Sequence, residues 1–185
     1  MNIFFLSVDP EEAAKMLCDK HVVKMILEAC QMLSTACHLR SQRAEGIYKP
    51  THINHPTCIW VRGCVENFKW TARHAVAIGK EYTRRYGKRH ACQDMAEWFL
   101  HHPIVSGEEE TYKGETMTAS VDIPVGCSPV PLAIKNKNLV VYKGGKASLV
   151  LSYRKYYLEE KRTFASWKMP SKPPRWWDRS QNEIE

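Results

Sequence analysis

The sequence lacks any apolar run of membrane-spanning length, and it contains no internal repeat and no low-complexity tract. A helix needs about 20 consecutive apolar residues to cross a bilayer, so we expect no membrane-spanning segment. The opening MNIFFLSVDPEE has no basic residue before its apolar ones and turns acidic at once, which is unlike a secretion signal. These absences favour a soluble folded protein over a membrane or repeat protein.

A disulfide scaffold is also poorly supported, because the seven cysteines are an odd number and three of them lie in one predicted buried helix. We therefore expect a reduced intracellular protein, in the cytoplasm or in the nucleoid or nucleus of a host cell. Hydrophobic residues make up 44% and charged residues 25% of the chain, which excludes wholesale disorder. At 185 residues, the chain is long enough for one domain with a proper core.

Acidic residues are too few to balance the basic ones, and the 27 Lys and Arg against 20 Asp and Glu give a net charge of +7. This balance favours a polyanion as partner, with DNA as the first expectation and an anionic nucleotide as the smaller alternative. Aromatic residues within a few positions of Lys or Arg could stack on exposed bases. They are Trp70, Tyr82, Tyr86, Tyr153, Tyr156, Tyr157, Trp176 and Trp177.

The stretch from Cys18 to His38 has the pattern of a buried helix with one narrow polar stripe. At about 100° per residue the polar side chains share one arc, while almost all the other positions are apolar. An ordinary surface helix has a much wider polar face, so the pattern predicts a helix buried among neighbours with its stripe toward a cleft. The stripe consists of Lys20, His21, Lys24, Glu28, Gln31, Thr35 and His38.

The residue types in this stripe indicate a catalytic site. His21, Lys24 and Glu28 provide an acid, a base and a cation within reach of one another, so we take them as candidate catalytic residues. Lys20 and Gln31 are candidate substrate-binding residues on the same arc. Two alternatives stay open: the helix is a core helix with one solvated edge, or Lys24 and Glu28 form an ordinary i, i+4 ion pair.

The rest of the chain predicts a mainly α protein, a single-domain helical bundle over residues 1–166 with an irregular or β-containing insert at 104–145. The insert is either ordered or a mobile lid, and a basic tail with prolines and tryptophans follows at 167–185. Residues 2–8 predict an extended segment or short strand. Predicted helices cover 10–17, 57–86, 91–101 and 147–162, the first capped by Asp9 and the second stopped at Gly87, with β-like pieces at 118–123 and 139–142.

A second polar cluster lies in the predicted loop between residues 39 and 56. Loops carry binding residues more often than core elements do, so the cluster is a candidate substrate-binding segment. The spacing of His52, His55 and Cys58 also suits metal ligands, but Pro56 interrupts the helix that would align them and no second pair completes a tetrahedral set. We therefore expect a capping turn, without metal or cofactor. The candidates are Tyr48, Lys49, His52, Asn54 and His55.

Two cationic runs are candidate phosphate-binding edges. One spans residues 80–90 and the other residues 153–162, and we take Arg84, Arg85, Arg154 and Lys155 as the substrate-binding residues within them. For the first run the helix dipole gives a simpler explanation, because it favours cations at a helix C-terminus.

The order of these features resembles the phage pyrimidine-dimer DNA glycosylases, which are small, basic, helical and monomeric repair enzymes. The likeness is carried by the start Asn2-Ile3-Phe4-Phe5-Leu6, the striped helix, the loop from Tyr48-Lys49 to His55-Pro56, the helix ending Arg84-Arg85-Tyr86-Gly87, and the C-terminal Tyr-Arg-Lys-Tyr-Tyr segment. The sequence is also similar to uncharacterised phage and large-virus proteins with a DKHVVKM helix and an NHP loop.

The resemblance implies an enzyme that flips a nucleotide out of the duplex. In that family the α-amine of the residue after the initiator Met attacks the sugar C1′, a Schiff base forms, and a helix carboxylate assists lyase cleavage. An α-amine suits this role because its pKa near 8 leaves much of it neutral.

This sequence departs from the family at the nucleophile. Asn2 is larger than the small second residue of the family, so Met1 is expected to stay, and Val22 stands where a loose alignment puts the family's carboxylate. The nearest acids are Asp19 and Glu28. We therefore take Lys24 as the candidate nucleophile, activated by desolvation and by Lys20, with Glu28 moving the proton.

Together these observations predict a monomeric base-excision DNA glycosylase or lyase with a flipped-nucleotide pocket, acting on DNA without cofactor or membrane. Two alternatives remain. The same pocket could act on a free nucleotide or modified base, or the protein could be a DNA-binding viral accessory protein without catalysis.

Overall fold

The computed structural model describes residues 1–40, 45–104, 110 and 112–178. Parts of the predicted loop (41–44), insert (105–109 and 111) and tail (179–185) lie outside the described residues. The helices are α1 (Pro10–Met16), α2 (Asp19–Leu39), α3 (Pro56–Gly63), α4 (Val65–Tyr86), α5 (Gln93–His101) and α6 (Leu149–Glu160). The strands form two small antiparallel sheets, β1 (Thr118–Ala119) with β2 (Val130–Pro131) and β3 (Val141–Lys143) with β4 (Lys146–Ser148). The mainly α class is confirmed.

The first two helices begin where the sequence predicts. The side chain of Asp9 accepts hydrogen bonds from the backbone N–H groups of Glu11 and Glu12, and Pro10 occupies the first helical position. The sequence left open whether α1 and α2 are continuous. They are separate, because Leu17 and Cys18 have extended backbone dihedrals between them.

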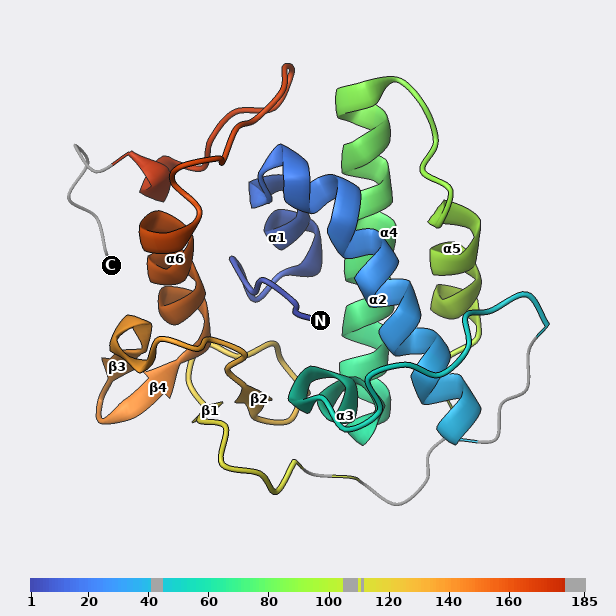
Figure 1. Cartoon of the computed structure of the whole chain (residues 1–185), viewed down its shortest axis with the longest axis horizontal. Helices are drawn as coiled ribbons and strands as arrows, with labels where there is room; N and C mark the ends of the chain where they lie inside the picture. Colours follow the sequence, from blue (N-terminus) through green and yellow to red (C-terminus); the bar gives the residue numbers. More distant parts are fainter. Residues whose placement is uncertain (41–44, 105–109, 111, 179–185) are drawn as a thin grey trace.

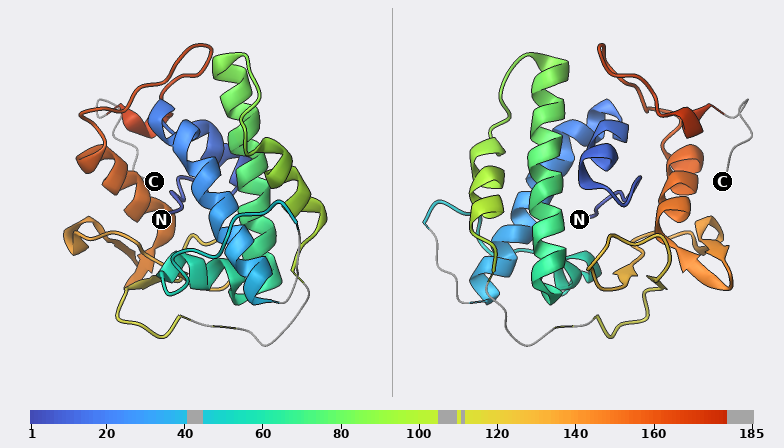
Figure 2. Two further views of the ribbon diagram at one scale, coloured as in Figure 1. Left: turned by 45° about the vertical axis from the view of Figure 1, so that its right-hand side comes forward. Right: turned by 180° about the vertical axis from the view of Figure 1, so that it is seen from behind.

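The core forms around α2 and α4, which cross in the centre of the molecule (Figure 1). The N-terminal segment lies between these helices on one side and α6 on the other (Figures 1 and 2). It forms no strand. Ile3, Phe4, Phe5 and Leu6 are all buried, and Phe5 stacks on Trp70 of α4 with ring centroids 4.7 Å apart. Burial of four large apolar side chains fixes the start of the chain inside the fold.

The single helix predicted over residues 57–86 is wrong, because the chain breaks at Cys64 into α3 and α4. The side-chain amide of Asn67 donates to the carbonyl of Trp60 at 2.7 Å, the carbonyl that a continuous helix would bond to Cys64. The carbonyl of Gly63 accepts instead from the backbone N–H of Glu110 at 3.1 Å. Tertiary hydrogen bonds therefore replace the helical ones at the break.

The other predicted helix ends agree with the structure to within about two residues, the usual uncertainty of helix boundaries, whereas the β-like piece at 118–123 is a strand only over Thr118–Ala119. Gly87 ends α4 in the left-handed region with φ of 68°, and its N–H bonds to the carbonyl of Thr83. The hairpin of β3 and β4 turns through Gly144 and Gly145, both with positive φ, as a two-residue hairpin requires.

The insert at 104–145 packs on the helices through its described residues. Ala119, Val130 and Leu132 are buried in the core. The indole N–H of Trp60 donates to the carbonyl of Ser128 at 3.1 Å, which ties the insert to α3. The sequence left open an ordered insert or a lid, and the contacts favour the ordered form for the part that the structure describes.

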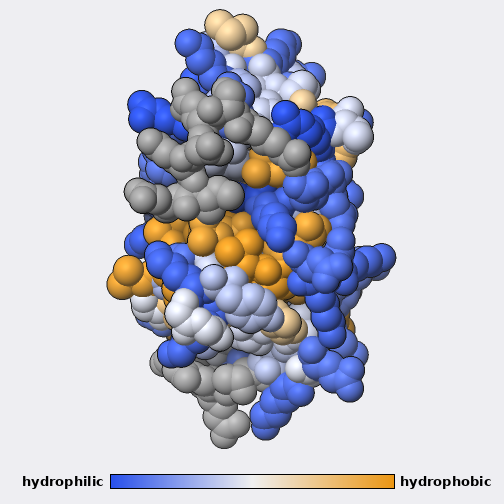
Figure 3. Space-filling model, turned by 90° about the vertical axis from the view of Figure 1, so that its left-hand side faces the viewer, coloured by the Kyte–Doolittle hydropathy of each residue, from blue (hydrophilic) through white to orange (hydrophobic). Residues whose placement is uncertain are grey.

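The described part of the tail, residues 167–178, folds back on the domain. The indole of Trp167 donates to the carbonyl of Met16 at 3.2 Å, and the backbone N–H of Lys168 donates to Asp19 at 2.9 Å. The side that carries α6 and this tail shows a band of apolar side chains bordered by hydrophilic ones (Figure 3). On α6, Leu151 and Leu158, at i and i+7, remain half-buried.

No helix within the described residues is both long enough and apolar enough to pass through a bilayer.

A buried ion network joins the ends of α2 and α4. The Arg85 guanidinium is fully buried and contacts Glu81 at 2.7 Å and Asp19 at 2.9 Å. It also donates to the carbonyl of Lys15 at 3.1 Å. The hydroxyl of Ser171 in the tail donates to Glu81 at 2.5 Å, so the tail closes the network.

We expect Arg85→Leu to lower the free energy of unfolding by about 3 to 5 kcal/mol, because it leaves two carboxylates without their buried partner. Arg89→Leu is the matched control, since Arg89 also contacts two carboxylates, Asp94 and Glu97, but its side chain is 54% exposed. The control should change the free energy little. Urea unfolding followed by circular dichroism measures both, and equal losses would contradict the burial argument.

Candidate functional site

The start of the chain is held against a carboxylate of α2. The backbone N–H of Asn2 donates to Glu28 Oε2 at 2.9 Å, and the amine of Met1 lies 3.8 Å from the same oxygen. The Lys24 ammonium contacts Glu28 Oε1 at 3.2 Å. Glu28 is only 9% exposed. One buried carboxylate therefore gathers two backbone nitrogens and a side-chain ammonium.

The side chain of Asn2 fixes this arrangement from the other side. Its Oδ1 accepts from the hydroxyl of Tyr153 on α6 at 2.8 Å and from the backbone N–H of Ile3 at 2.8 Å. Its Nδ2 donates to the carbonyl of Ala133 in the insert at 3.2 Å. The chain start is thus bonded to α2, to α6 and to the insert at once.

His55 lies close to the same carboxylate and caps α3. Its Nδ1 accepts from the backbone N–H of Thr57 at 3.2 Å, so the proton of the neutral ring is on Nε2. Burial lowers the pKa of His55, the positive charges of the chain start and of His52 lower it further, and the charge of Glu28 opposes them. The imidazole is therefore neutral at neutral pH. We call Met1, Asn2, Lys24, Glu28 and His55 the N-terminal site.

The C-terminal half of the polar stripe holds the loop that carries His55. The Ser34 hydroxyl accepts from the backbone N–H of Tyr48 at 3.2 Å, and His38 Nε2 bonds to the carbonyl of Tyr48 at 3.1 Å. Thr35 Oγ1 accepts from the N–H of Thr51 at 3.1 Å and donates to its carbonyl at 3.2 Å. Thr35 and His38 of the stripe, together with Ser34 beside them, therefore have structural roles.

The structure does not bring all the loop candidates together. Lys49, His52 and Asn54 are exposed, and His52 has a positive φ of 49°. Tyr48 turns toward α5, where its hydroxyl bonds to the thiol of Cys92 at 3.4 Å. That hydrogen bond is the main reason why the pKa of Tyr48 rises to about 12.

His21 lies in an aromatic cluster and not at the Glu28 carboxylate. It stacks on Phe4 with ring centroids 4.3 Å apart, and its Nδ1 shares a hydrogen bond with the hydroxyl of Tyr157. Burial, with smaller contributions from the charges of Lys161 and Lys24, lowers the pKa of His21 to about 3. The ring is therefore neutral over the physiological range.

The expectation that Lys24 is desolvated is wrong, because its side chain is 67% exposed. Lys20 is also exposed, and its ammonium lies 4.7 Å from the centre of the Phe164 ring. Gln31 is half-buried, three residues after Glu28 on the same helix.

The arginines that the sequence predicted as phosphate contacts bind groups of the protein itself, although Arg84 remains exposed at the surface. Arg85 belongs to the buried network, and Arg84 contacts Glu81 at 2.8 Å and Ser171 at 2.8 Å. Arg154 donates to the carbonyl of Leu6 at 3.0 Å, which supports the N-terminal segment. Lys155 is exposed and donates to the carbonyl of Asn138 at 3.0 Å.

Sequence reasoning did not identify Asn2 or Tyr153 as site residues, because their contact joins positions 151 residues apart. The one signal available was the carboxylate in the stripe. Val22 occupies the position that a loose alignment gives to the family's carboxylate, and it is fully buried in the core. The acid that contacts the first residues of the chain is Glu28.

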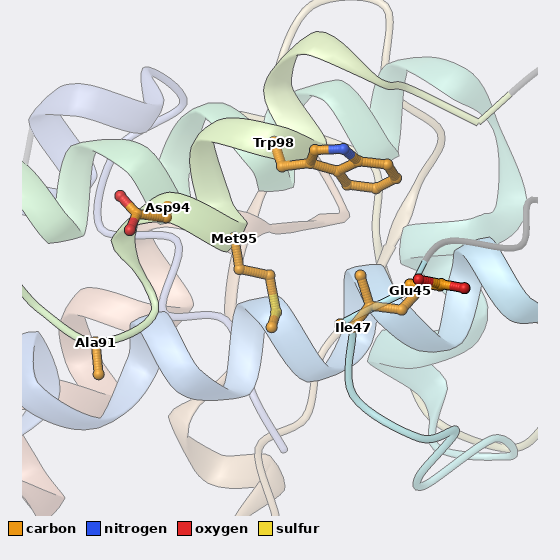
Figure 4. A pocket seen from close by; sticks show the side chains of 7 residues that line it. Glu45, Ile47, Ala91, Asp94, Met95 and Trp98 are labelled. Atoms are coloured by element: carbon orange, nitrogen blue, oxygen red, sulfur yellow. The ribbon is translucent and has the colours of Figure 1, made fainter.

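A separate hollow of about 280 Å³ lies between α5 and the loop that follows α2 (Figure 4). Met95, Trp98 and Ile47 line it, with Asp94 and Glu45 at its edge. It faces away from α6 and the N-terminal site, because α5 lies on the other side of α2 and α4 (Figures 1 and 2). Among the described residues, no group of three or more His, Cys, Asp or Glu side chains is placed to hold a metal.

We expect His21→Phe to weaken the acid dependence of stability. A buried neutral histidine has a lower pKa in the folded chain than in the unfolded one, so its contribution is complete above about pH 6.5 and falls as the pH drops toward 3. In that window each such histidine adds a slope of about 1.4 kcal/mol per pH unit, which the variant loses. Buried His74, with its pKa lowered to about 4 by burial, keeps its own slope.

Urea unfolding between pH 6.5 and 4.5 measures this slope, and the exposed His101→Phe is the matched control. Equal slopes for His21→Phe and the wild type would show that His21 is protonated inside the fold.

Comparison with known proteins agrees with the resemblance in the sequence. A family model described as pyrimidine dimer DNA glycosylase matches residues 1–94, which include α1 to α4 and every residue of the N-terminal site. No curated protein and no solved structure matches the chain. At the level of the family, the function is that of a DNA glycosylase in DNA repair, with DNA as substrate. The chain belongs to the pyrimidine dimer DNA glycosylase family.

Proposed function

We propose that the protein is a DNA glycosylase with lyase activity, and that a nucleotide flipped out of the duplex reacts at the N-terminal site. The observation that carries the proposal is the contact of Glu28 with the backbone nitrogens of Asn2 and Met1. A buried carboxylate beside an amine is the pair that Schiff-base chemistry requires. Glu28 contacts the first nitrogen whether the chain begins at Met1 or at Asn2. If Met1 is removed, the nitrogen of Asn2 becomes the α-amine, and Glu28 already binds it.

The reaction follows from these groups. The amine nitrogen at the chain start attacks C1′ of the flipped sugar, the glycosidic bond breaks, and the base leaves with the bonding electrons. The nitrogen loses a proton, and the sugar ring then opens: the C1′–O4′ bond breaks, its electron pair and a proton go to O4′, and a protonated Schiff base forms between the nitrogen and C1′. Glu28 then accepts the proton from C2′, and the 3′ phosphate leaves in a β-elimination. The Lys24 ammonium holds the carboxylate in place at 3.2 Å.

The amine at the chain start suits the nucleophile better than Lys24 does. An α-amine is a weaker base than a lysine amine, so more of it is neutral near pH 7. Lys24 is 67% exposed, which removes the desolvation that would activate it. His55 remains neutral beside the site and offers its Nε2 proton to a leaving base.

The site favours the polymer over the free nucleotide. None of the five residues of the N-terminal site is an arginine, the side chain best suited to bind the terminal phosphate of a free nucleotide. We place the reaction in a reducing compartment, the cytoplasm, nucleoid or nucleus, because the odd number of cysteines in the sequence suits a reduced protein better than a disulfide scaffold. We further propose that the protein is a monomer, as the resemblance to these monomeric enzymes implies.

The proposal is tested with a duplex that carries one pyrimidine dimer and a second duplex that carries one abasic site. We expect salt-dependent binding of both and cleavage of the strand at the lesion. Binding without cleavage would support a DNA-binding protein without catalysis, and absence of binding would support an enzyme of free nucleotides. Either result overturns the proposal.

We expect Glu28→Gln to slow cleavage of the abasic duplex by about 10² to 10⁴, the usual contribution of a general base. The glutamine oxygen still accepts from Asn2, so the fold and DNA binding should persist. Glu66→Gln is the matched control, since Glu66 is exposed in the first turn of α4. Gel-resolved single-turnover kinetics measure the rates, and a wild-type rate for Glu28→Gln would remove Glu28 from the reaction.

A further inference from the structure

Three lysines gather beside the N-terminal site from two distant parts of the chain. Lys20 and Lys24 lie in the first two turns of α2, and Lys161 lies at the C-terminal end of α6. The ammonium groups of Lys20 and Lys161 lie 4.7 and 6.0 Å from the centre of one ring, that of Phe164. Both Lys24 and Lys161 lower the pKa of His21, so they lie around the same point. We call Lys20, Lys24 and Lys161 the lysine cluster.

The charges of the lysine cluster are poorly compensated within the protein. Lys24 contacts Glu28, but in the part of the chain that the structure describes neither Lys20 nor Lys161 forms an ion pair with a carboxylate. The neighbouring Asp19 is already bonded to Arg85 and to the tail. Three cations close together therefore repel one another with only one acid between them.

The position of Lys20 adds to this repulsion. It stands in the first turn of a 21-residue helix, where the helix dipole is positive and favours an anion. Aromatic rings hold the cations in place, with Lys161 also 4.4 Å from the ring of Tyr156. Such contacts contribute about 0.5 to 1 kcal/mol at exposed sites. The arrangement presents unpaired positive charge at a fixed place, which is the property of an anion-binding surface.

We propose that the lysine cluster binds the phosphate backbone of the DNA strand that carries the reacting nucleotide. This rests on the proposed function, because the cluster adjoins the N-terminal site through the Lys24–Glu28 contact. A DNA strand supplies one negative charge per nucleotide, and flexible lysine ammonium groups bind phosphates as point charges. The cluster takes the role that Arg84 and Arg85, both paired with Glu81, do not fill. Lys161 lies outside residues 1–94, so the family match does not assign it.

The test is the salt dependence of DNA affinity in the double variant Lys20→Gln, Lys161→Gln. The probe is a duplex with a tetrahydrofuran abasic analogue, which binds but cannot form a Schiff base. Each lost phosphate contact should reduce the slope of log K against log salt by about 0.9, so the double variant should lose about 1.8. Lys20 is exposed and Lys161 is half-buried at the end of α6, and neither forms part of the core, so the variant should fold, and circular dichroism checks this.

The control is Lys69→Gln, Arg73→Gln, which removes the same net charge from two exposed positions one turn apart on α4. It should keep the wild-type slope. An unchanged slope in the lysine-cluster variant, or an equal loss in both variants, would overturn the proposal, because net charge alone would then explain the binding.

Failure of this proposal and failure of the proposed function give different results. In single-turnover cleavage of the abasic duplex, the lysine-cluster variant should need more DNA for half-maximal rate and keep the maximal rate, whereas Glu28→Gln loses the maximal rate. A reduced salt slope without any cleavage supports the phosphate contact and removes the lyase. If the variant cleaves DNA and its slope of log K against log salt equals that of the wild type, the phosphate contact is rejected and the lyase activity is supported.

Discussion

The contact between Glu28 and the first backbone nitrogens constrains the whole structure. A chain start is normally free, but here Asn2 is bonded to α2, α6 and the insert, and the next four residues are buried. The helices on both sides must therefore close around an extended segment before the core is complete. The same contact places an amine and a carboxylate together at the edge of that core.

The polar stripe of α2 serves different purposes along its length. Near the N-terminus of the helix, Lys20 and Lys24 are exposed beside the chain start, and in the middle Glu28 holds it. Toward the C-terminus, Thr35 and His38 bind the backbone of the loop that carries His55. A helix with a narrow polar stripe can thus position two other segments and still leave charge available to a ligand.

Much of the fold could be predicted from local patterns, because the interactions that decide them are local. Asp9 and Pro10 start α1, Gly87 ends α4, and the apolar surroundings of the stripe indicated burial of α2. The break at Cys64 could not be predicted, since it depends on Asn67 and Glu110 taking the hydrogen bonds of the helix. Long-range contacts override the periodicity there.

The candidate site was predictable in part for the same reason. The stripe identified Glu28 and Lys24, but only the folded chain brings Asn2 and Tyr153 to them. For the arginines the sequence also carries the pattern of the contacts observed: Glu81 stands three and four residues before Arg84 and Arg85, the spacing of helical ion pairs. A cationic run with an acid at that spacing is more often part of the structure than a phosphate contact.

The most direct measurement identifies which nitrogen reacts. Borohydride reduction of the protein with abasic DNA, followed by nuclease digestion, proteolysis and mass spectrometry, locates the sugar adduct on one peptide. The account predicts the adduct on the α-amine of the first residue, within the peptide that precedes Lys15, and the same spectrum reports whether Met1 is present. An adduct on Lys24, or none at all, would contradict the claim that the chain start held by Glu28 is the reacting centre.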